Sequence, residues 1–126
     1  MLRPQYHGRH VNGHFHVWDV RSLVGLAEDL PIVDYPLAQI REIDEPYWFD
    51  GFDNKPTCRI IEEHARLIMQ ADLQWPILLC VDGRVLDGMH RVMKAVGEGR
   101  KTIPARRFPT ALTPDFVDPD PAELTY

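Results

Sequence analysis

The chain lacks the features that mark membrane and secreted proteins. No apolar run in its 126 residues approaches the roughly 20 residues of a membrane span, and the opening MLRPQYHGRH has no apolar stretch of the secretory type. Cysteine is scarce, since Cys58 and Cys80 are the only two and neither belongs to a CxxC pair. We therefore expect two reduced thiols and a cytoplasmic protein.

Internal repeats and linkers are also missing. A chain of 126 residues with 44% hydrophobic residues has the size of one compact domain with a single core. Its final segment differs, because 109–126 holds four prolines and four acidic residues but no basic residue. We expect a domain at 1–108 followed by an extended, acidic, proline-rich tail at 109–126.

Basic residues are unevenly distributed. The chain has a formal charge of −5, yet the segment from residue 84 to residue 107 contains seven basic and two acidic residues, which gives it a local net charge of +5. A short basic segment in an acidic chain favours a site for a small anion over a broad nucleic-acid surface. We expect no specific DNA binding by the chain alone. The seven basic residues are Arg84, Arg91, Lys94, Arg100, Lys101, Arg106 and Arg107.

The clearest pattern predicts a hairpin followed by a helix. Asp82-Gly83 separates the apolar runs ILLCV and RVL, and this dipeptide is typical of a two-residue β-hairpin turn. From Met89 onward, apolar residues recur at helical spacing. Asp87 or Gly88 is therefore the expected N-cap.

The start of this helix is suited to bind an anion. The first N–H groups of a helix have no partner inside it and lie at the positive end of its dipole, which favours phosphate or carboxylate. His90 and Arg91 fall in that first turn. Arg91 either clamps an anion through its planar guanidinium group or forms a salt bridge to Glu98 or another acid.

The same residues resemble the motif of the ParB/sulfiredoxin superfamily. Its members share a strand, a Gly-x-x-Arg turn, a helix and a further strand. Here IPARRF resembles the last strand, PTCRIIEEHARLIMQADLQWPILL the helix and strand before the motif, and PLAQIR the first core strand and its turn. The resemblance spans 31–108 and implies a single α/β (α+β) domain, a small mixed sheet with flanking helices. The matching turn residues are Asp87, Gly88, Met89, His90 and Arg91.

The resemblance also implies a nucleotide site. In relatives this turn and its arginine hold the phosphates of ATP or CTP, and Mg²⁺ screens the charge. Carried over to this chain, phosphate contact falls to Gly88, to the N–H groups of Met89 and His90, and to Arg91, with Asp87 beside them.

Three residues are candidates for catalysis. In the free-serine-kinase branch of the superfamily, a carboxylate shortly after the first core strand acts as the base, and Asp44 and Glu45 fall near that place. They lie in the segment 42–53, in which acidic and aromatic residues mix and which is either a surface flap or a lid over a site. Solvated loop acids are the simpler interpretation. His90, in the turn itself, is the third candidate.

The chain departs from the family pattern at two points, and each departure argues against one function of the family's members for this chain. Sulfiredoxin carries its catalytic cysteine within the turn, where this chain has Met89, so reduction of sulfinic acids is not expected. The chromosome-partitioning members continue into a helix-turn-helix region. Here only the short segment 109–126 follows Phe108, so operator binding by that route is not expected.

Three functions stay open. The first is transfer or hydrolysis of a phosphoryl group of a nucleoside triphosphate at the turn 88–91. The second is a nucleotide-responsive binding module without chemistry. The third is an ADP-ribosyltransferase-type toxin that uses NAD in the same pocket and has an antitoxin partner. The nucleotide, the acceptor and the oligomeric state, including a homodimer, are left open.

Histidines gather near the amino end. A His-x-His pair can bind zinc, but a closed site needs three or four ligands and no cysteine lies nearby. We expect no metal site but a solvated or ligand-facing strand, after which Asp19 caps a short helix. The histidines are His7, His10, His14 and His16.

A second helix is expected at 57–71 and has the pattern of ordinary scaffold. Its apolar residues recur at helical spacing and are expected to be buried, while two i,i+4 ion pairs face solvent. His64 receives no catalytic role. The residues expected inside are Ile60, Ile61, Ala65, Leu67 and Ile68, and the pairs are Arg59 with Glu63 and Glu62 with Arg66.

Overall fold

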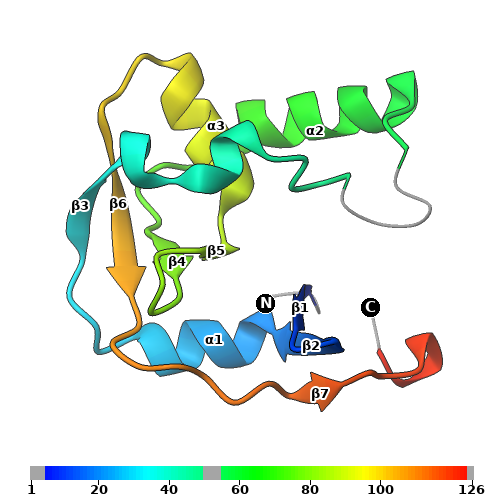
Figure 1. The fold of residues 1–126 in the computed structure, drawn as a ribbon. Coiled ribbons are helices and arrows are strands. Elements are labelled where there is room, and N and C mark those ends of the chain that lie inside the picture. The colour runs from blue at the N-terminus through cyan, green and yellow to red at the C-terminus, as the bar shows by residue number, and fades with distance from the viewer. Residues whose placement is uncertain (1–4, 50–54, 125–126) are drawn as a thin grey trace.

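The computed structural model describes residues 5–49 and 55–124, which form two β-sheets and three α-helices (Figure 1). This mixed arrangement confirms the predicted α+β fold class. The strands are β1 (Tyr6–Val11), β2 (His14–Asp19), β3 (Val33–Pro36), β4 (Ile77–Leu79), β5 (Val85–Asp87), β6 (Thr102–Arg107) and β7 (Phe116–Val117). The α-helices are α1 (Val20–Ala27), α2 (Cys58–Gln70) and α3 (Met89–Gly97), and the 3-10 helices are η1 (Leu37–Gln39), η2 (Arg41–Asp44) and η3 (Pro121–Glu123).

The larger sheet has the strand order β3-β6-β4-β5 and contains the predicted hairpin around Asp82-Gly83. The predicted two-residue turn is wrong, because the N–H of Cys80 donates to the carbonyl of Arg84 at 2.8 Å and leaves the three residues 81–83 in the loop. β4 and β5 are antiparallel, and the N–H of Gly83 donates to the carbonyl of Cys80. Gly83 has a φ of +78°, which glycine adopts at little cost. β6 runs parallel to β4 and antiparallel to β3, so the sheet is mixed, as expected.

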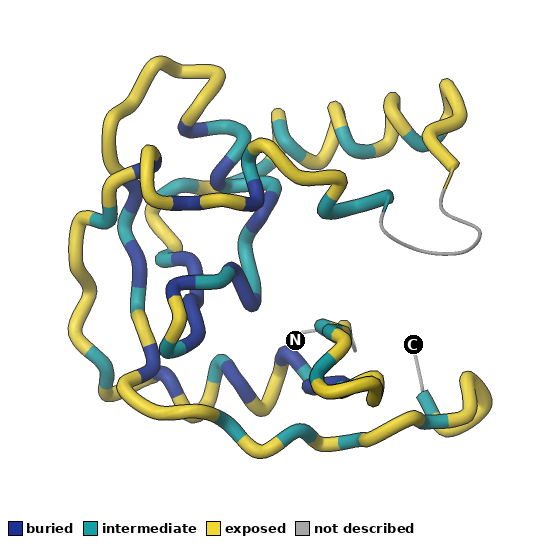
Figure 2. Tube along the Cα trace, viewed as in Figure 1, coloured by how far each residue is buried: buried dark blue, intermediate teal, exposed yellow. Residues whose placement is uncertain are grey.

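Side-chain alternation along β4 divides the core into two halves. Ile77 and Leu79 pack with α3 on one face of the sheet, while Leu78 and Cys80 pack with α1 on the other. Figure 2 shows the buried residues concentrated along these central strands and on the inner sides of α1 and α3. The sheet is therefore the middle layer, with α3 packed on one face and α1 on the other.

The smaller sheet, β1-β2-β7, joins the two ends of the described chain. β7 pairs antiparallel with β2. Next to this pair, the carboxylate of Asp115 accepts a hydrogen bond from the N–H of Asp19 at 2.7 Å, and Asp118 accepts from the N–H of Phe15 at 2.8 Å. Part of the segment 109–126 thus forms a strand, and two of its acids are bound to the sheet.

Two helices begin at capping side chains. The carboxylate of Asp19 accepts from the N–H of Arg21 at 2.9 Å, which confirms the predicted cap of α1. The hydroxyl of Thr57 accepts from the N–H of Ile60 at 3.2 Å at the start of α2. Each side chain satisfies an N–H group that the helix itself leaves unpaired.

The prediction that α2 buries an apolar face is wrong. None of its residues is buried, and Ile61 and Leu67 are 52% and 42% exposed. The reason is position, because α2 packs against α3 and extends beyond the sheet, so much of its apolar face has no neighbour (Figure 1). Of the two predicted ion pairs, the structure shows Arg66 with Glu62, at 3.0 Å.

The strand predicted from PLAQIR lies earlier in the chain than expected. β3 ends at Pro36, and the next residues form η1 and η2, from which Leu37 and Ile40 fill the core beside α3. Both cysteines are free thiols, as expected: Cys58 is exposed and Cys80 is buried. Within the described residues, no helix has the length and apolar character needed to cross a membrane.

Candidate functional site

The turn between β5 and α3 is built on Gly88, the N-cap of α3. Its φ is +106°, and a Cβ at this position would lie 2.6 Å from Cγ2 of Ile77. Glycine alone fits both the left-handed backbone and this close contact. No side chain caps the helix, so the N–H groups of Met89 and His90 lie at an uncapped helix start, which suits an anion. The side chain of Met89 is buried in the core.

Arg91 is anchored by the protein itself. Its Nη1 donates to the carbonyls of Trp75 and Pro76 at 3.0 and 2.7 Å, and its Nη2 donates to Oδ2 of Asp87 at 2.9 Å. These contacts use three of the five N–H groups of a guanidinium, and the described residues supply no further partner. Two N–H groups are therefore left for a ligand. The acid paired with Arg91 is Asp87, whereas Glu98 pairs with Arg100.

A hollow of about 780 Å³ adjoins this turn. Asp87, Gly88, His90 and Arg91 line it, and Trp75, whose side chain is 62% exposed, adds an aromatic ring. Much of the remaining wall comes from α1 and from the carboxyl end of α2. A largely apolar hollow with a few converging polar groups has the character of a small-molecule site. The wall residues from α1 and α2 include Val24, Ala27, Leu67 and Gln70.

His90 forms a hydrogen-bonded pair with His64. Nδ1 of His64 lies 2.8 Å from Nε2 of His90, and the Trp48 ring stacks on both imidazoles with centroid distances of 4.3 and 4.6 Å. One nitrogen must donate and the other accept, so the two rings cannot both be protonated. Burial lowers the pKa of His90 to about 4, with a smaller contribution from His64. His90 is therefore neutral near pH 7, a state in which it is able to act as a base or acceptor but not as a cation.

Most cations of the basic segment stabilise the fold. Lys94 donates to two carbonyls at the carboxyl end of α2, and Arg106 donates to three at the carboxyl end of α1. Helix carboxyl ends carry partial negative charge, so these contacts are favourable. The segment is therefore less available to an anion than its net charge suggests. In the same way, Arg84 binds Glu45, Arg100 binds Glu98, and Arg107 binds the carbonyl of Val81.

The two predicted catalytic carboxylates are not part of the hollow beside Arg91. Asp44 is exposed at the end of η2, and the carboxylate of Glu45 accepts two contacts of 2.7 and 3.0 Å from Nη1 of Arg84. The segment 42–53, predicted to be either a surface flap or a lid, falls partly on 50–54, which lies outside the described residues. The carboxylates that do line the hollow are Glu28, Asp72 and Asp87.

Sequence reasoning missed two residues at these sites. His64 was treated as scaffold, although it is the partner of His90. Glu42, an acid of the segment 42–53 to which the sequence assigned no role, is 4% exposed and accepts a hydrogen bond from the N–H of Val85. No local signal separates Glu42 from its acidic neighbours, since its burial depends on β5, about 40 residues later.

The four histidines of the amino end lie on β1 and β2 and have different surroundings. Nδ1 of His14 is 2.7 Å from the carboxylate of Asp118, and Nδ1 of His7 is 3.4 Å from the hydroxyl of Tyr47. Across 5–49 and 55–124, no three His, Cys, Asp or Glu side chains are grouped so as to hold a metal ion. His10 and His16 contact the aromatic rings of Phe15 and Trp18.

Comparison with known proteins gives no relative: no protein-family model matches the chain, and no curated protein or solved structure matches it.

Proposed function

We propose that this chain is a nucleotide-binding module of the ParB/sulfiredoxin type that holds phosphate groups at the turn 88–91. One observation carries the proposal: a single hollow combines the uncapped start of α3, the anchored Arg91 and the exposed ring of Trp75. Phosphate is favoured by the first two groups, and a flat base by the third.

The residues that line this hollow indicate how a nucleotide and its charge would be held. Phosphate oxygens accept from the N–H groups of Met89 and His90 and from the two remaining N–H groups of Arg91, and the base stacks on Trp75. The carboxylates of Glu28, Asp72 and Asp87 oppose a phosphate unless a cation lies between them, which is the part that Mg²⁺ plays for ATP or CTP. NAD offers a similar pyrophosphate and is the alternative ligand.

Binding without chemistry is the form of the proposal that the geometry supports best. A phosphotransferase needs a base within hydrogen-bond reach of its acceptor, and neither Asp44 nor Glu45 lines the hollow. His90 does line it and is neutral, so it is the residue to test if turnover is found. The buried thiol of Cys80, which forms no disulfide, fits a reducing compartment, and the cytoplasm is the location we propose.

The test is a calorimetric titration of the full chain with ATP, CTP, GTP and NAD, with and without Mg²⁺. We expect binding of at least one nucleotide, weakened about 5- to 150-fold by Trp75→Ala, because base stacking on an aromatic ring contributes roughly 1 to 3 kcal/mol. The matched control is Met69→Ala, since Met69 is also exposed but does not line the hollow.

Three outcomes would contradict this proposal in different ways. If none of the four nucleotides binds, the proposal that the ligand is a nucleotide is wrong. If a nucleotide binds and neither Trp75→Ala nor Arg91→Lys weakens it, the proposed binding site is wrong. Release of phosphate or nicotinamide at a rate that depends on the chain would replace the binding module with an enzyme.

A further inference from the structure

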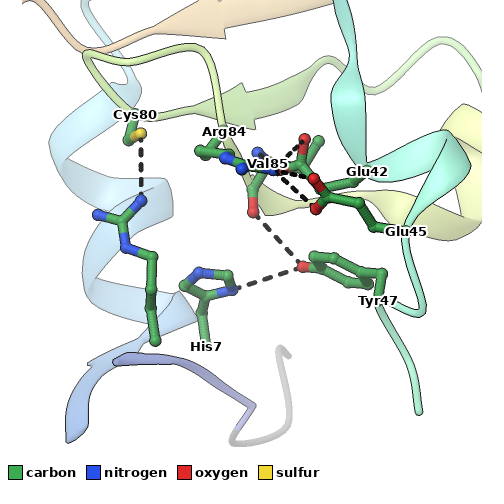
Figure 3. Close-up of polar contacts among 8 residues, drawn as sticks. His7, Glu42, Glu45, Tyr47, Cys80, Arg84 and Val85 are labelled. Atoms are coloured by element: carbon green, nitrogen blue, oxygen red, sulfur yellow. Dashed lines mark hydrogen bonds and ion pairs between the residues drawn. The ribbon is translucent and has the colours of Figure 1, made fainter. Parts of the chain in front are cut away.

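A second hollow, of about 740 Å³, lies beside β1 and is separate from the proposed nucleotide site. His7 on β1, Glu42 on η2, Tyr47 after it, and Arg84 next to β5 line this hollow and point toward one another (Figure 3). Arg9 on β1 also lines it. The described residues that line it include none of those that line the first hollow. What binds here is therefore a question independent of the nucleotide.

Glu42 brings an incompletely paired charge to this hollow. Its Oε2 accepts from the N–H of Val85 at 2.5 Å, whereas Oε1 has no hydrogen-bond partner among the described residues. The nearest recorded cation is Nη1 of Arg84, 3.6 Å from Oε1, which makes its shorter contacts of 2.7 and 3.0 Å to Glu45. A buried carboxylate oxygen without a donor is costly, so Oε1 is a strong hydrogen-bond acceptor.

His7 supplies a second buried atom without a partner in the described chain, the ring nitrogen Nε2. The hydroxyl of Tyr47 lies 3.4 Å from both the carbonyl of Val85 and Nδ1 of His7. A carbonyl oxygen can only accept a hydrogen bond. When the hydroxyl of Tyr47 donates its single proton to that carbonyl, Nδ1 of His7 must be the protonated ring nitrogen and donate to the hydroxyl oxygen. Burial, aided by the charge of Arg9, lowers the pKa of His7 to about 4, so the ring is neutral. Its Nε2 then carries a lone pair and is buried without a partner in the described chain.

The charges of the wall disfavour a charged ligand. Arg9 and Arg84 offset Glu42 and Glu45, so the lining has no excess of either sign. An ammonium group at Oε1 of Glu42 would meet Arg84, and an anion would meet the two carboxylates. The ligand that complements this hollow is a neutral donor of hydrogen bonds.

Aromatic rings supply the rest of the wall. Tyr6, Phe15 and Tyr47 line the same hollow, and such rings pack against the C–H faces of a ring that carries its hydroxyls at the edge. We propose that the second hollow binds a neutral, polyhydroxylated ring of the monosaccharide class, whose hydroxyls donate to Oε1 of Glu42 and Nε2 of His7. Because both atoms are shielded from water, the Arg84–Glu45 ion pair beside Oε1 must shift as the ligand enters.

The experiment is an NMR titration of the ¹⁵N-labelled full chain with D-glucose, D-ribose and myo-inositol, and with ethylamine and acetate as charged probes. We expect at least one polyol to shift the imidazole Nε2 of His7 and the backbone N–H of Val85. Glu42→Gln should weaken that binding about tenfold or more, the loss expected when a hydrogen bond to a buried charged group is removed. Asp34→Asn is the matched control, since it makes the same kind of change at an exposed carboxylate that does not line the hollow, and it should not weaken binding.

The proposal fails if no polyol shifts either resonance at about 50 mM, which would leave an ordered water as the partner of these atoms. It also fails if ethylamine or acetate binds in place of the polyols. Should Glu42→Gln not fold, Phe15→Ala removes a ring from the partly exposed wall and must weaken binding instead. The nucleotide titration of the same sample is unaffected by either result.

Discussion

Arg91 shapes the candidate site before any ligand arrives. Its contacts join the carbonyls of Trp75 and Pro76, just before β4, to the carboxylate of Asp87 at the end of β5. The guanidinium thus fixes the turn whose N–H groups face the hollow. A substitution of Arg91 therefore changes both the turn and the binding contact, whereas Trp75 is exposed and reports on binding alone.

Gly88→Ala should lower the free energy of unfolding by about 2 to 4 kcal/mol, because alanine is strained at a φ of +106° and its Cβ meets Ile77 at 2.6 Å. Gly97→Ala, where a Cβ meets nothing within 4 Å, should leave stability unchanged or raise it by up to about 1 kcal/mol. Urea denaturation of both variants measures the difference. Equal effects would contradict the assignment of strain to Gly88.

At the scale of elements, helix ends are stabilised by cations from other elements. Arg106 on β6 donates to carbonyls at and just after the end of α1, and Lys94 on α3 donates to carbonyls at and just after the end of α2. Each contact places a positive charge at the negative end of a helix dipole. The basic segment therefore links the helices to the rest of the fold.

Arg106→Met should cost about 1 to 3 kcal/mol of unfolding free energy, since it leaves helix carbonyls in a half-buried place without their donor. Arg100→Met, which removes an exposed ion pair with Glu98, should cost less than about 1 kcal/mol. Thermal unfolding followed by circular dichroism compares them. A loss at Arg100 as large as the loss at Arg106 would argue against the capping role.

The larger elements were predictable where the pattern is local. Asp82-Gly83 between two apolar runs indicated the β4–β5 hairpin, and the spacing from Met89 indicated α3, because turn residues and periodicity act on near neighbours. The same periodicity misled at α2. It shows that one side of a helix is apolar, but whether that side is covered depends on which elements pack against it, and Ile61 is left 52% exposed.

At the scale of the whole molecule, stability depends on histidines held neutral. The folded pKa of His7, about 4, lies below its ordinary 6.5, so between these values the unfolded chain binds the proton more readily. Keeping His7 neutral therefore costs the fold no stability above pH 6.5, and the free energy of unfolding decreases as the pH falls from 6.5 toward 4. His90 acts in the same direction, with a smaller effect because it is only half-buried.

His7→Phe should reduce the loss of unfolding free energy between pH 7 and pH 4 by roughly 2 to 3 kcal/mol, because a phenyl ring does not titrate. Urea denaturation across this pH range, on the full chain and the variant, measures the two slopes. The same slope in both proteins would show that His7 is not held neutral by the fold.

The sequence by itself determined the local geometry of the candidate site. The hairpin, the glycine at the cap and the helix with His90 and Arg91 in its first turn follow from residue types close together in the chain. Tertiary structure alone decided the partners: Arg91 with Trp75, His64 with His90, and the burial of Glu42 against β5. These contacts join residues 16 to 43 positions apart, and local pattern has no information about which distant groups the packed layers bring together.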